Sequence, residues 1–322
     1  GLIFVGPAPT HLSLFGNKAQ ARAAATTAGI PVTLGIDSAV TLDEAEAFFA
    51  ETGGPVMLKA IAGGGGRGSR AVLEANDISE AYTRCQSEAK AAFGRHIEVQ
   101  IIGDGLGGVA HFGTRECSLQ RRYQKLIEIA PAPDLDPALR DQIVDAALQL
   151  AKDAEYLNLG TFEFLVNARD DPTQPFVFIE ANARLQVEHT VTEEIFGIDL
   201  VHLQLRLAGG EPMANLVATA HSPKGYAIQA RVNMETILPD GSVKPGGGQI
   251  TAYETPSGPG VRVDGFGYTG YRTSTAFDSL LAKVICHSPS SDFSHAIAKT
   301  NRALSEFRIE GIATNIPFLQ NI

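Results

Sequence analysis

Two strongly apolar runs in the middle of the chain constrain its fold most, because each carries one glutamate. The runs are Thr161–Leu165, which contains Glu163, and Phe176–Glu180, which ends on Glu180. The segment between them, residues 167–175, is polar and contains a proline, so the two runs are predicted to form a β-hairpin. Carboxylates buried in such a hairpin need a cation or hydrogen-bond partners. The hairpin therefore predicts a sheet that also carries a site.

Over the rest of the chain, short β-rich runs alternate with amphipathic helical stretches, which indicates an α/β or α+β protein. Helices are predicted over 17–27, 42–52, 77–93, 136–154, 192–207 and 295–307, and further strands over 55–60, 70–73 and 96–102. From residue 224 onward the pattern changes to strands with Gly/Pro turns. A domain boundary is therefore predicted within residues 209–223.

Charge and composition argue against several classes of function. The net charge is −10, so nothing would offset phosphate repulsion at a nucleic acid or an anionic membrane. No apolar run approaches membrane-spanning length. The cysteines at 85, 117 and 286 are scattered, follow no metal-ligand spacing, and fit a reducing compartment. We expect the cytoplasm, or the mitochondrial matrix in a eukaryote.

A glycine-rich segment from Lys59 to Arg70 is a candidate phosphate loop. The glycines at 63–66 let backbone N–H groups approach a phosphate closely, and the flanking cations would neutralise it. The segment is not a Walker loop, because no Gly-Lys-Ser/Thr follows the glycines. It is not a dinucleotide fingerprint either, because a predicted strand comes next. Taken alone, the segment fits a flexible surface hairpin equally well.

Residues 180–189 place a polar side chain at every second position. In an extended strand these side chains would line one face: Glu180, Asn182, Arg184, Gln186 and Glu188. With Glu163 beside Glu180, two carboxylates and an amide oxygen form a hard-oxygen site that suits Mg²⁺. An edge strand with a solvated polar face is the alternative, and the apolar neighbours of the two glutamates weaken it.

Two basic features are ambiguous on their own. The run Gln120–Lys125 reads Gln-Arg-Arg-Tyr-Gln-Lys, and a short basic run is most often a solvated face. Arg231 lies in a predicted strand over residues 228–233, where an arginine is most often a surface or salt-bridging residue.

Taken together, these segments resemble the biotin carboxylase family, a branch of the ATP-grasp enzymes, over essentially the whole chain. The matching segments are 4–7, 16–18, 59–70, 95–100, 117–125, 160–164, 180–189, 231–233, 277–279 and 311–315. The resemblance implies an α+β ATP-grasp fold with a mobile glycine-rich lid, followed by a biotin carboxylase C-terminal domain. The implied division is 1–15 for the end of a preceding nucleotide-fold domain, 16–210 for the ATP-grasp domain with a lid near 32–100, and 211–322 for the C-terminal domain.

The resemblance also implies a role for each site residue. The nucleotide would be bound by Lys18, Lys59, Gly64, Gly65, Gly66, His96 and Gln120, and Mg²⁺ or Mn²⁺ by Glu163, Glu180 and Asn182. Bicarbonate would be bound by Lys125, Arg184, Gln186 and the backbone of Val187. Glu188 would be the general base that deprotonates bicarbonate, and Arg231 would stabilise the ureido oxygen of biotin.

The implied activity is the ATP- and bicarbonate-dependent carboxylation of biotin on a carrier domain, through carboxyphosphate. Carrier and carboxyltransferase domains are the implied partners, together with a homo-oligomer formed through biotin carboxylase domains. Residues 231–236 and 256–265 look closest to single-chain bacterial acyl-CoA carboxylases, so an acyl-CoA is the expected final acceptor. Pyruvate, propionyl-CoA and urea are alternatives. Two other readings are a non-catalytic nucleotide-binding or dimerisation remnant, and another ATP-grasp ligase such as a carbamoyl-phosphate synthetase.

The chain departs from the family pattern in three places. It opens at the last strand of the family's N-terminal domain, and a short hinge stretch is absent at residues 93–95. Tyr123 stands where many relatives have histidine. Because the flanks match in full, we expect the two omissions to be stretches missing from the sequence rather than evolved deletions.

Overall fold

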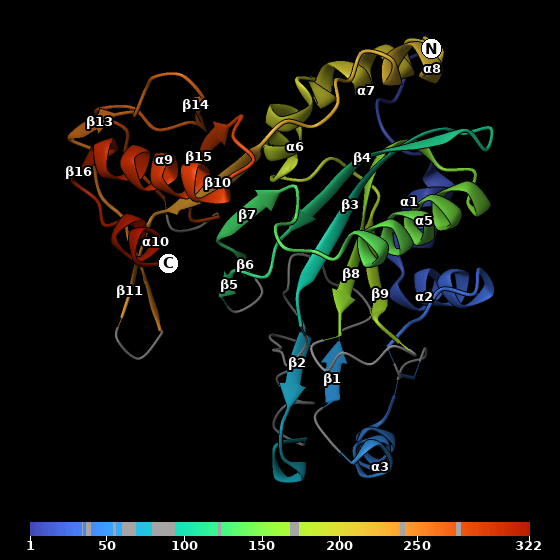
Figure 1. Ribbon diagram of the computed structural model, residues 1–322. Coiled ribbons are helices and arrows are strands. Elements are labelled where there is room, and N and C mark those ends of the chain that lie inside the picture. The colour runs from blue at the N-terminus through green and yellow to red at the C-terminus, as the bar shows by residue number, and fades with distance from the viewer. Residues whose placement is uncertain are drawn as a thin grey trace. The chain divides into compact units, whose positions relative to one another are not determined.

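The chain forms two compact units in a computed structural model (Figure 1), which describes residues 1–33, 35–36, 40–53, 56–59, 69–78, 94–121, 124–167, 174–238, 242–274 and 278–322. At residues 57, 59 and 69–71 the backbone alone is described. The first unit comprises residues 1–125, 134–186 and 199–219, and the second comprises 126–133, 187–198 and 220–322.

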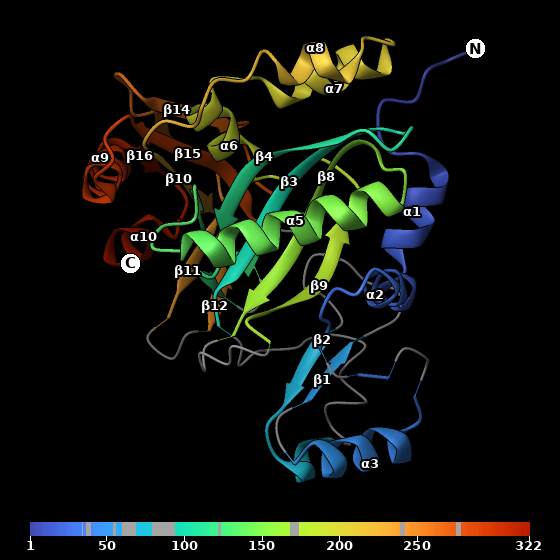
Figure 2. The same ribbon diagram turned by 45° about the vertical axis from the view of Figure 1, so that its right-hand side comes forward.

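The first unit is built on an antiparallel sheet with the strand order β4-β3-β8-β9. Its strands are β3 (His96–Asp104), β4 (Val109–Glu116), β8 (Leu157–Val166) and β9 (Phe176–Asn182). Helix α5 (Pro137–Asp153) packs along β3 and β4, while α1 (Pro9–Gly16) and α2 (Lys18–Thr27) lie against β9 (Figure 2). Helix α7 (Leu200–Ala208) contacts β8, and α8 (Met213–Val217) contacts α7.

The predicted hairpin is confirmed, since β8 and β9 pair with Glu163 opposite Glu180. Phe162, Phe164 and Phe178 are at most 1% exposed, and their rings pack edge to face. Burying each of these rings contributes about 1.5–3 kcal/mol. The aromatic layer therefore fixes the register, because a one-residue slip of either strand would exchange its aromatic and polar faces.

Side-chain caps set the first residue of several helices, three of which begin where a helix was predicted. Asn17 caps α2, Thr41 caps α3 (Leu42–Thr52), and Asp136 caps α5. In α3, the Thr41 backbone N–H donates to Glu44 Oε2 at 2.7 Å, which completes a capping box. Each such cap contributes about 1 kcal/mol. These starts agree with the predicted helices to within one residue.

A small two-stranded sheet follows α3. Strands β1 (Val56–Lys59) and β2 (Ser69–Val72) pair antiparallel, and the 3-10 helix η1 (Ala75–Asp77) comes next. The helix predicted over 77–93 lies outside the described residues from position 79 on, and Asp77, the first residue of that range, lies in η1. The glycines at 63–66 also lie outside the described residues.

The second unit contains an antiparallel stretch of sheet, with the strand order β14-β15-β10-β7. Its strands are β7 (Ile127–Ala130), β10 (Tyr226–Asn233), β14 (Val261–Gly265) and β15 (Leu280–Ser288). Helices α6 (His189–Phe196), α9 (Phe293–Glu306) and α10 (Ile316–Asn321) pack against it. Two small sheets pair β11 (Glu235–Ile237) with β12 (Val243–Pro245) and β13 (Ala252–Glu254) with β16 (Arg308–Glu310). Within the described ranges, no helix has the length and apolarity needed to cross a bilayer.

The single long helix predicted over 192–207 is wrong, because the chain forms two helices there. Gly197 adopts φ 64° and its N–H bonds to Glu193 O, which ends α6. Asp199 then starts α7 by accepting a hydrogen bond from His202 N at 2.7 Å. A left-handed glycine and an N-cap aspartate two residues apart are strong stop and start signals, and they outweigh the continuous apolar periodicity.

Candidate functional site

Three glutamates lie in register across the sheet of the first unit: Glu98 pairs with Glu163, and Glu163 with Glu180. Glu98 and Glu163 are only 0% and 3% exposed. Lys125 bridges them, since its Nζ forms an ion pair with Glu98 and lies 3.4 Å from Glu163 Oε1. Lys125 reaches this face from β6 (Gln124–Lys125), which pairs with β5 (Gln120–Arg121).

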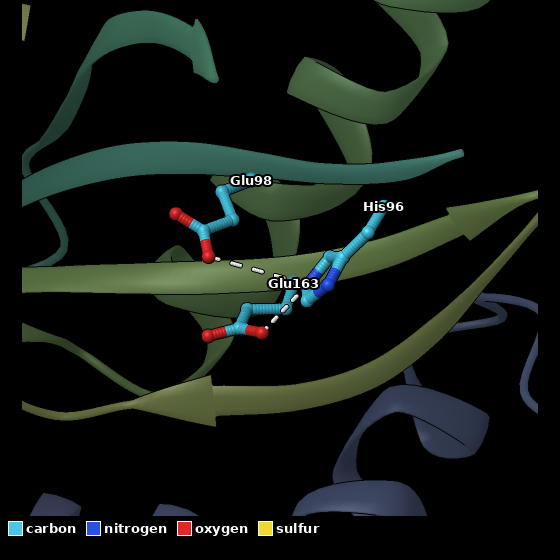
Figure 3. A group of neighbouring side chains, drawn as sticks. All are labelled: His96, Glu98 and Glu163. Atoms are coloured by element: carbon cyan, nitrogen blue, oxygen red, sulfur yellow. Dashed lines mark ion pairs between the residues drawn. The ribbon is translucent and has the colours of Figure 1, made fainter. Parts of the chain in front are cut away.

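His96 lies on the same face as Glu98, two residues earlier in β3, and both point toward Glu163 (Figure 3). Its Nε2 is 2.7 Å from Glu163 Oε2, and its Nδ1 is 2.7 Å from Gln120 Nε2. Burial alone would lower the pKa of His96, but the Glu163 carboxylate outweighs it and the pKa of His96 is raised. Burial would raise the pKa of Glu163, yet Lys125 and His96 hold that pKa well below its usual value. Glu163 is therefore a carboxylate at neutral pH.

The three predicted metal ligands converge. Asn182 Nδ2 donates to Glu163 Oε1 at 2.6 Å and lies 3.4 Å from Glu180 Oε1. Lys18 approaches from α2, and its Nζ donates to Glu180 Oε2 at 3.1 Å. The two carboxylates are hard donors of the kind that Mg²⁺ and Mn²⁺ prefer, so they fit the implied metal. Asn182 turns its amide nitrogen toward them and its oxygen toward Arg184.

A β-bulge in β9 makes this convergence possible. Glu163 and Phe164 are adjacent in β8, but their partners Glu180 and Phe178 are two residues apart in β9. The extra residue, Ile179, therefore puts Phe178 with the aromatic layer and Glu180 with the other carboxylates. A regular strand would have put both side chains on one face.

The one-faced ladder predicted over residues 180–189 is wrong beyond Asn182, where β9 ends. The Arg184 backbone N–H donates to Asn182 O at 2.8 Å, which turns the chain out of the sheet. The Arg184 side chain is exposed and donates back to Asn182 Oδ1 at 3.1 Å. Gln186 is buried instead and donates to Glu163 Oε1 at 2.8 Å. Of these two predicted anion ligands, Gln186 thus contacts Glu163 directly. Arg184 contacts Asn182, which in turn contacts Glu163.

A second cluster lies wholly within the second unit. The Arg231 guanidinium donates from Nε to Glu128 Oε1 at 2.5 Å and from Nη2 to Glu188 Oε2 at 3.0 Å. Both carboxylates are at most 2% exposed. Burial raises the pKa of Glu128, and the charge of Glu188 adds to this effect against the opposing effect of Arg231. Two buried carboxylates therefore share one guanidinium in this cluster.

The turn that carries Glu188 is anchored to the sheet of the second unit. Lys283, buried in β15, donates from Nζ to Val187 O at 2.9 Å and lies 3.4 Å from Asp264. Burial lowers the pKa of Lys283. The backbone of Val187 is a predicted bicarbonate contact, and its carbonyl oxygen already accepts this hydrogen bond from Lys283.

Sequence reasoning missed two carboxylates that touch predicted site residues. Glu98 could have been found from the alternation His96-Ile-Glu98, which puts it on the face of His96. Glu128 gave no such signal, because it is brought to Arg231 by the pairing of β7 with β10. The side chains of Lys59 and Tyr123, and residues Gly64, Gly65 and Gly66, lie outside the described part of the chain.

Comparison with known proteins gives matches over nearly the full chain. Residues 17–216 match the family described as carbamoyl-phosphate synthase L chain, ATP binding domain, and residues 229–322 match the biotin carboxylase C-terminal domain. The pyruvate carboxylase of Bacillus subtilis (strain 168) is 46% identical over 342 residues, covering 100% of this chain and 29% of that protein. The mitochondrial pyruvate carboxylase of Mus musculus is 45% identical over 339 residues, covering 100% of this chain and 28% of that protein. The chain thus spans less than a third of these curated relatives.

Three solved structures are similar in fold. The biotin carboxylase domain of a single-chain bacterial carboxylase has a TM-score of 0.84 at 48% identity, covering 99% of this chain and 70% of that one. The biotin carboxylase domain dimer of the Hydrogenobacter thermophilus 2-oxoglutarate carboxylase, solved with MgADP, ADP and bicarbonate, has a TM-score of 0.89 at 36% identity, covering 100% and 72%. A single-chain, multi-domain long-chain acyl-CoA carboxylase has a TM-score of 0.83 at 43% identity, covering 99% and 31%.

The antiparallel sheet of the first unit has one face that carries Glu98, Glu163 and Glu180, the carboxylate face. This sheet and the C-terminal unit define an α+β protein of the ATP-grasp class. Within that class, the chain belongs to the biotin carboxylase family. The resemblance found in the sequence is confirmed.

Proposed function

We propose that this chain is the part of a longer carboxylase that uses ATP and bicarbonate to carboxylate biotin on a carrier domain. The observation that carries the proposal is the buried group formed by Glu128, Glu188 and Arg231, in which one guanidinium contacts two buried carboxylates and holds Glu188 in place as a base for bicarbonate. A module that only bound nucleotide would have no need for this costly arrangement.

The carboxylate face of the first unit supplies the nucleotide side of the reaction. Lys18, Lys59, the glycines at 64–66, His96 and Gln120 would bind ATP, and Glu163, Glu180 and Asn182 would hold Mg²⁺ or Mn²⁺. The metal ion, when bound, would neutralise charge on the phosphates. Glu163 suits this role because its pKa is held well below the usual value, which keeps it ionised.

Bicarbonate would be held by Lys125, Arg184, Gln186 and the backbone of Val187. Glu188 would take the proton of bicarbonate while a bicarbonate oxygen attacks the γ-phosphorus of ATP. The bond between the γ-phosphorus and the oxygen that bridges it to the β-phosphate would break. The products of this step are carboxyphosphate and ADP. Arg231 would then stabilise the negative charge on the ureido oxygen when biotin loses its N1 proton, because a fixed guanidinium costs no reorganisation.

Turnover of the full-length protein tests this proposal. We expect bicarbonate-dependent release of ADP that free biotin stimulates. Glu188→Gln should lower the rate by about 100-fold or more, the usual contribution of a general base, while calorimetry still detects binding of MgADP.

Glu194→Gln is the matched control, because Glu194 lies six residues further along the chain on α6 and faces Arg262. It should leave turnover unchanged. Nucleotide binding without turnover in the folded wild-type protein would instead support a non-catalytic remnant. Ammonia-dependent turnover that ignores biotin would support a carbamoyl-phosphate synthetase.

For the final acceptor we propose pyruvate in place of the acyl-CoA expected from the sequence. The curated relatives at 46% and 45% identity are named pyruvate carboxylases, and they align with the whole chain. The acyl-CoA alternative keeps support from one similar structure at 43% identity.

We further propose carrier and carboxyltransferase domains as partners, and a dimer of biotin carboxylase domains like the one named for the Hydrogenobacter protein. A reducing compartment is in keeping with Cys117 and Cys286, which are buried and form no disulfide.

A further inference from the structure

A fully buried arginine lies on the same face of the first unit's sheet as Glu98, its cross-strand neighbour. Arg115, in β4, has 0% of its surface exposed and is among the largest fully buried side chains described. Its Nη1 donates to Gln100 Oε1 at 2.8 Å, and its Nη2 donates to Thr161 Oγ1 at 3.0 Å. A guanidinium stays charged under all physiological conditions, so its burial calls for compensation.

The compensation comes from the site itself. Arg115 Nε donates to Glu98 Oε2 at 3.1 Å, while the other oxygen of Glu98 pairs with Lys125. Glu98 is therefore held between two cations. Arg115 is thus tied to the same carboxylate that anchors Lys125, although no sequence motif indicated it.

Arg115 also contacts Gln186, and this hydrogen bond fixes the orientation of the Gln186 side-chain amide. Arg115 Nη2 donates to Gln186 Oε1 at 3.2 Å, and Gln186 Nε2 donates to Glu163 Oε1 at 2.8 Å. A guanidinium has only donors. If the Gln186 amide turned over, its NH₂ would meet the guanidinium and its oxygen would meet the Glu163 carboxylate, and both contacts would be repulsive. Arg115 therefore determines which end of the amide faces Glu163.

We propose that Arg115 is a positioning residue for anion binding: it holds the Gln186 amide with its N–H groups toward the site. The inference rests on the proposed function, in which Gln186 binds bicarbonate. Positioning by a side chain matters here because Gln186 lies beyond the end of β9, in a segment that is neither helix nor strand. The sheet therefore does not fix this residue through its ladder of hydrogen bonds.

Arg115→Lys in the full-length protein tests the inference. Lysine keeps the charge beside Glu98 but lacks the planar fork that reaches Gln186. We expect the KM for bicarbonate to rise about 10-fold, corresponding to the loss of one charge-assisted hydrogen bond. The KM for ATP, kcat and the calorimetric affinity for MgADP should stay within about twofold. In a Gln186→Leu background, Arg115→Lys should raise the bicarbonate KM no further.

Thr161→Val is the matched control, because it removes a different partner of the same guanidinium. It should leave the bicarbonate KM unchanged.

An unchanged bicarbonate KM in folded Arg115→Lys, or an equal rise in the KM for bicarbonate and the KM for ATP, would overturn the inference while leaving the proposed function intact. If Arg115→Lys does not fold, Gln186→Leu alone must raise the bicarbonate KM and Thr161→Val must not; any other result overturns the inference. A folded wild-type protein without bicarbonate-dependent ADP release would overturn both proposals.

Discussion

At the scale of single residues, charges in the first unit shift one another's protonation. The half-buried His96 and the buried Glu163 lie 2.7 Å apart, so each favours the charged form of the other. The pKa of His96 is raised from 6.5 and that of Glu163 is lowered well below 4.5. Neither shift is visible in the sequence, because it depends on Lys125 and Glu98 as well.

These shifts predict how stability depends on pH. Because the folded pKa of His96 is raised, its contribution is fully present below 6.5 and is lost as pH rises through the raised value. Glu163 behaves in the opposite sense: its contribution is present above 4.5 and is lost as pH falls through the lowered value. The free energy of unfolding should therefore decline above pH 6.5 in urea titrations of the chelator-treated protein. His96→Gln should flatten this decline, whereas the exposed His295→Gln should not. An equal decline in all three proteins would contradict the assignment.

At the scale of elements, the ends of strands and helices place the site. The bulge at Ile179 turns Glu180 toward Glu163, and the end of β9 at Asn182 frees Gln186 from the ladder. The left-handed Gly197 ends α6, the short helix that begins directly after Glu188. Each of these local irregularities positions a predicted site residue.

Gly197→Ala tests the role of this helix end. A non-glycine residue in the left-handed region costs about 1–2 kcal/mol, and the added Cβ would lie 3.0 Å from the His221 ring. We therefore expect the free energy of unfolding, measured by urea denaturation, to fall by about 1–2 kcal/mol. Gly16→Ala is the control, since a Cβ at position 16 meets nothing within 4 Å. Equal stability of both variants would show that α6 does not depend on its glycine cap.

At the scale of the whole molecule, the chain contains two units with separate sets of site residues. The first holds the carboxylate face, and the second holds the group of Glu128, Glu188 and Arg231. The chain covers 29% and 28% of two pyruvate carboxylases, and the proposed final acceptor rests on this likeness and not on the side chains of either unit.

The acceptor can be predicted and measured on the full-length protein. With ATP and labelled bicarbonate, we expect label to enter a keto acid product when pyruvate is supplied. Acetyl-CoA, propionyl-CoA, a long-chain acyl-CoA and urea, supplied separately as acceptors, should give no acid-stable label. Label incorporated with any of these acceptors and not with pyruvate would show that pyruvate is not the acceptor. The expected ADP release stimulated by biotin would be unaffected.

The sequence by itself determined the helices with strong caps, the β8–β9 hairpin and the family. These follow from local signals such as Asn17, Asp136 and the two apolar runs around Glu163 and Glu180. Tertiary structure alone decided where the polar ladder ends and which groups surround the glutamates. Glu98 and Glu128 reach Glu163 and Arg231 through pairing between strands distant in the chain. Arg115 reaches Thr161 and Gln186, which are also distant in the chain. A single sequence does not record such pairing, because the burial and charge that favour it arise only once the sheet has formed.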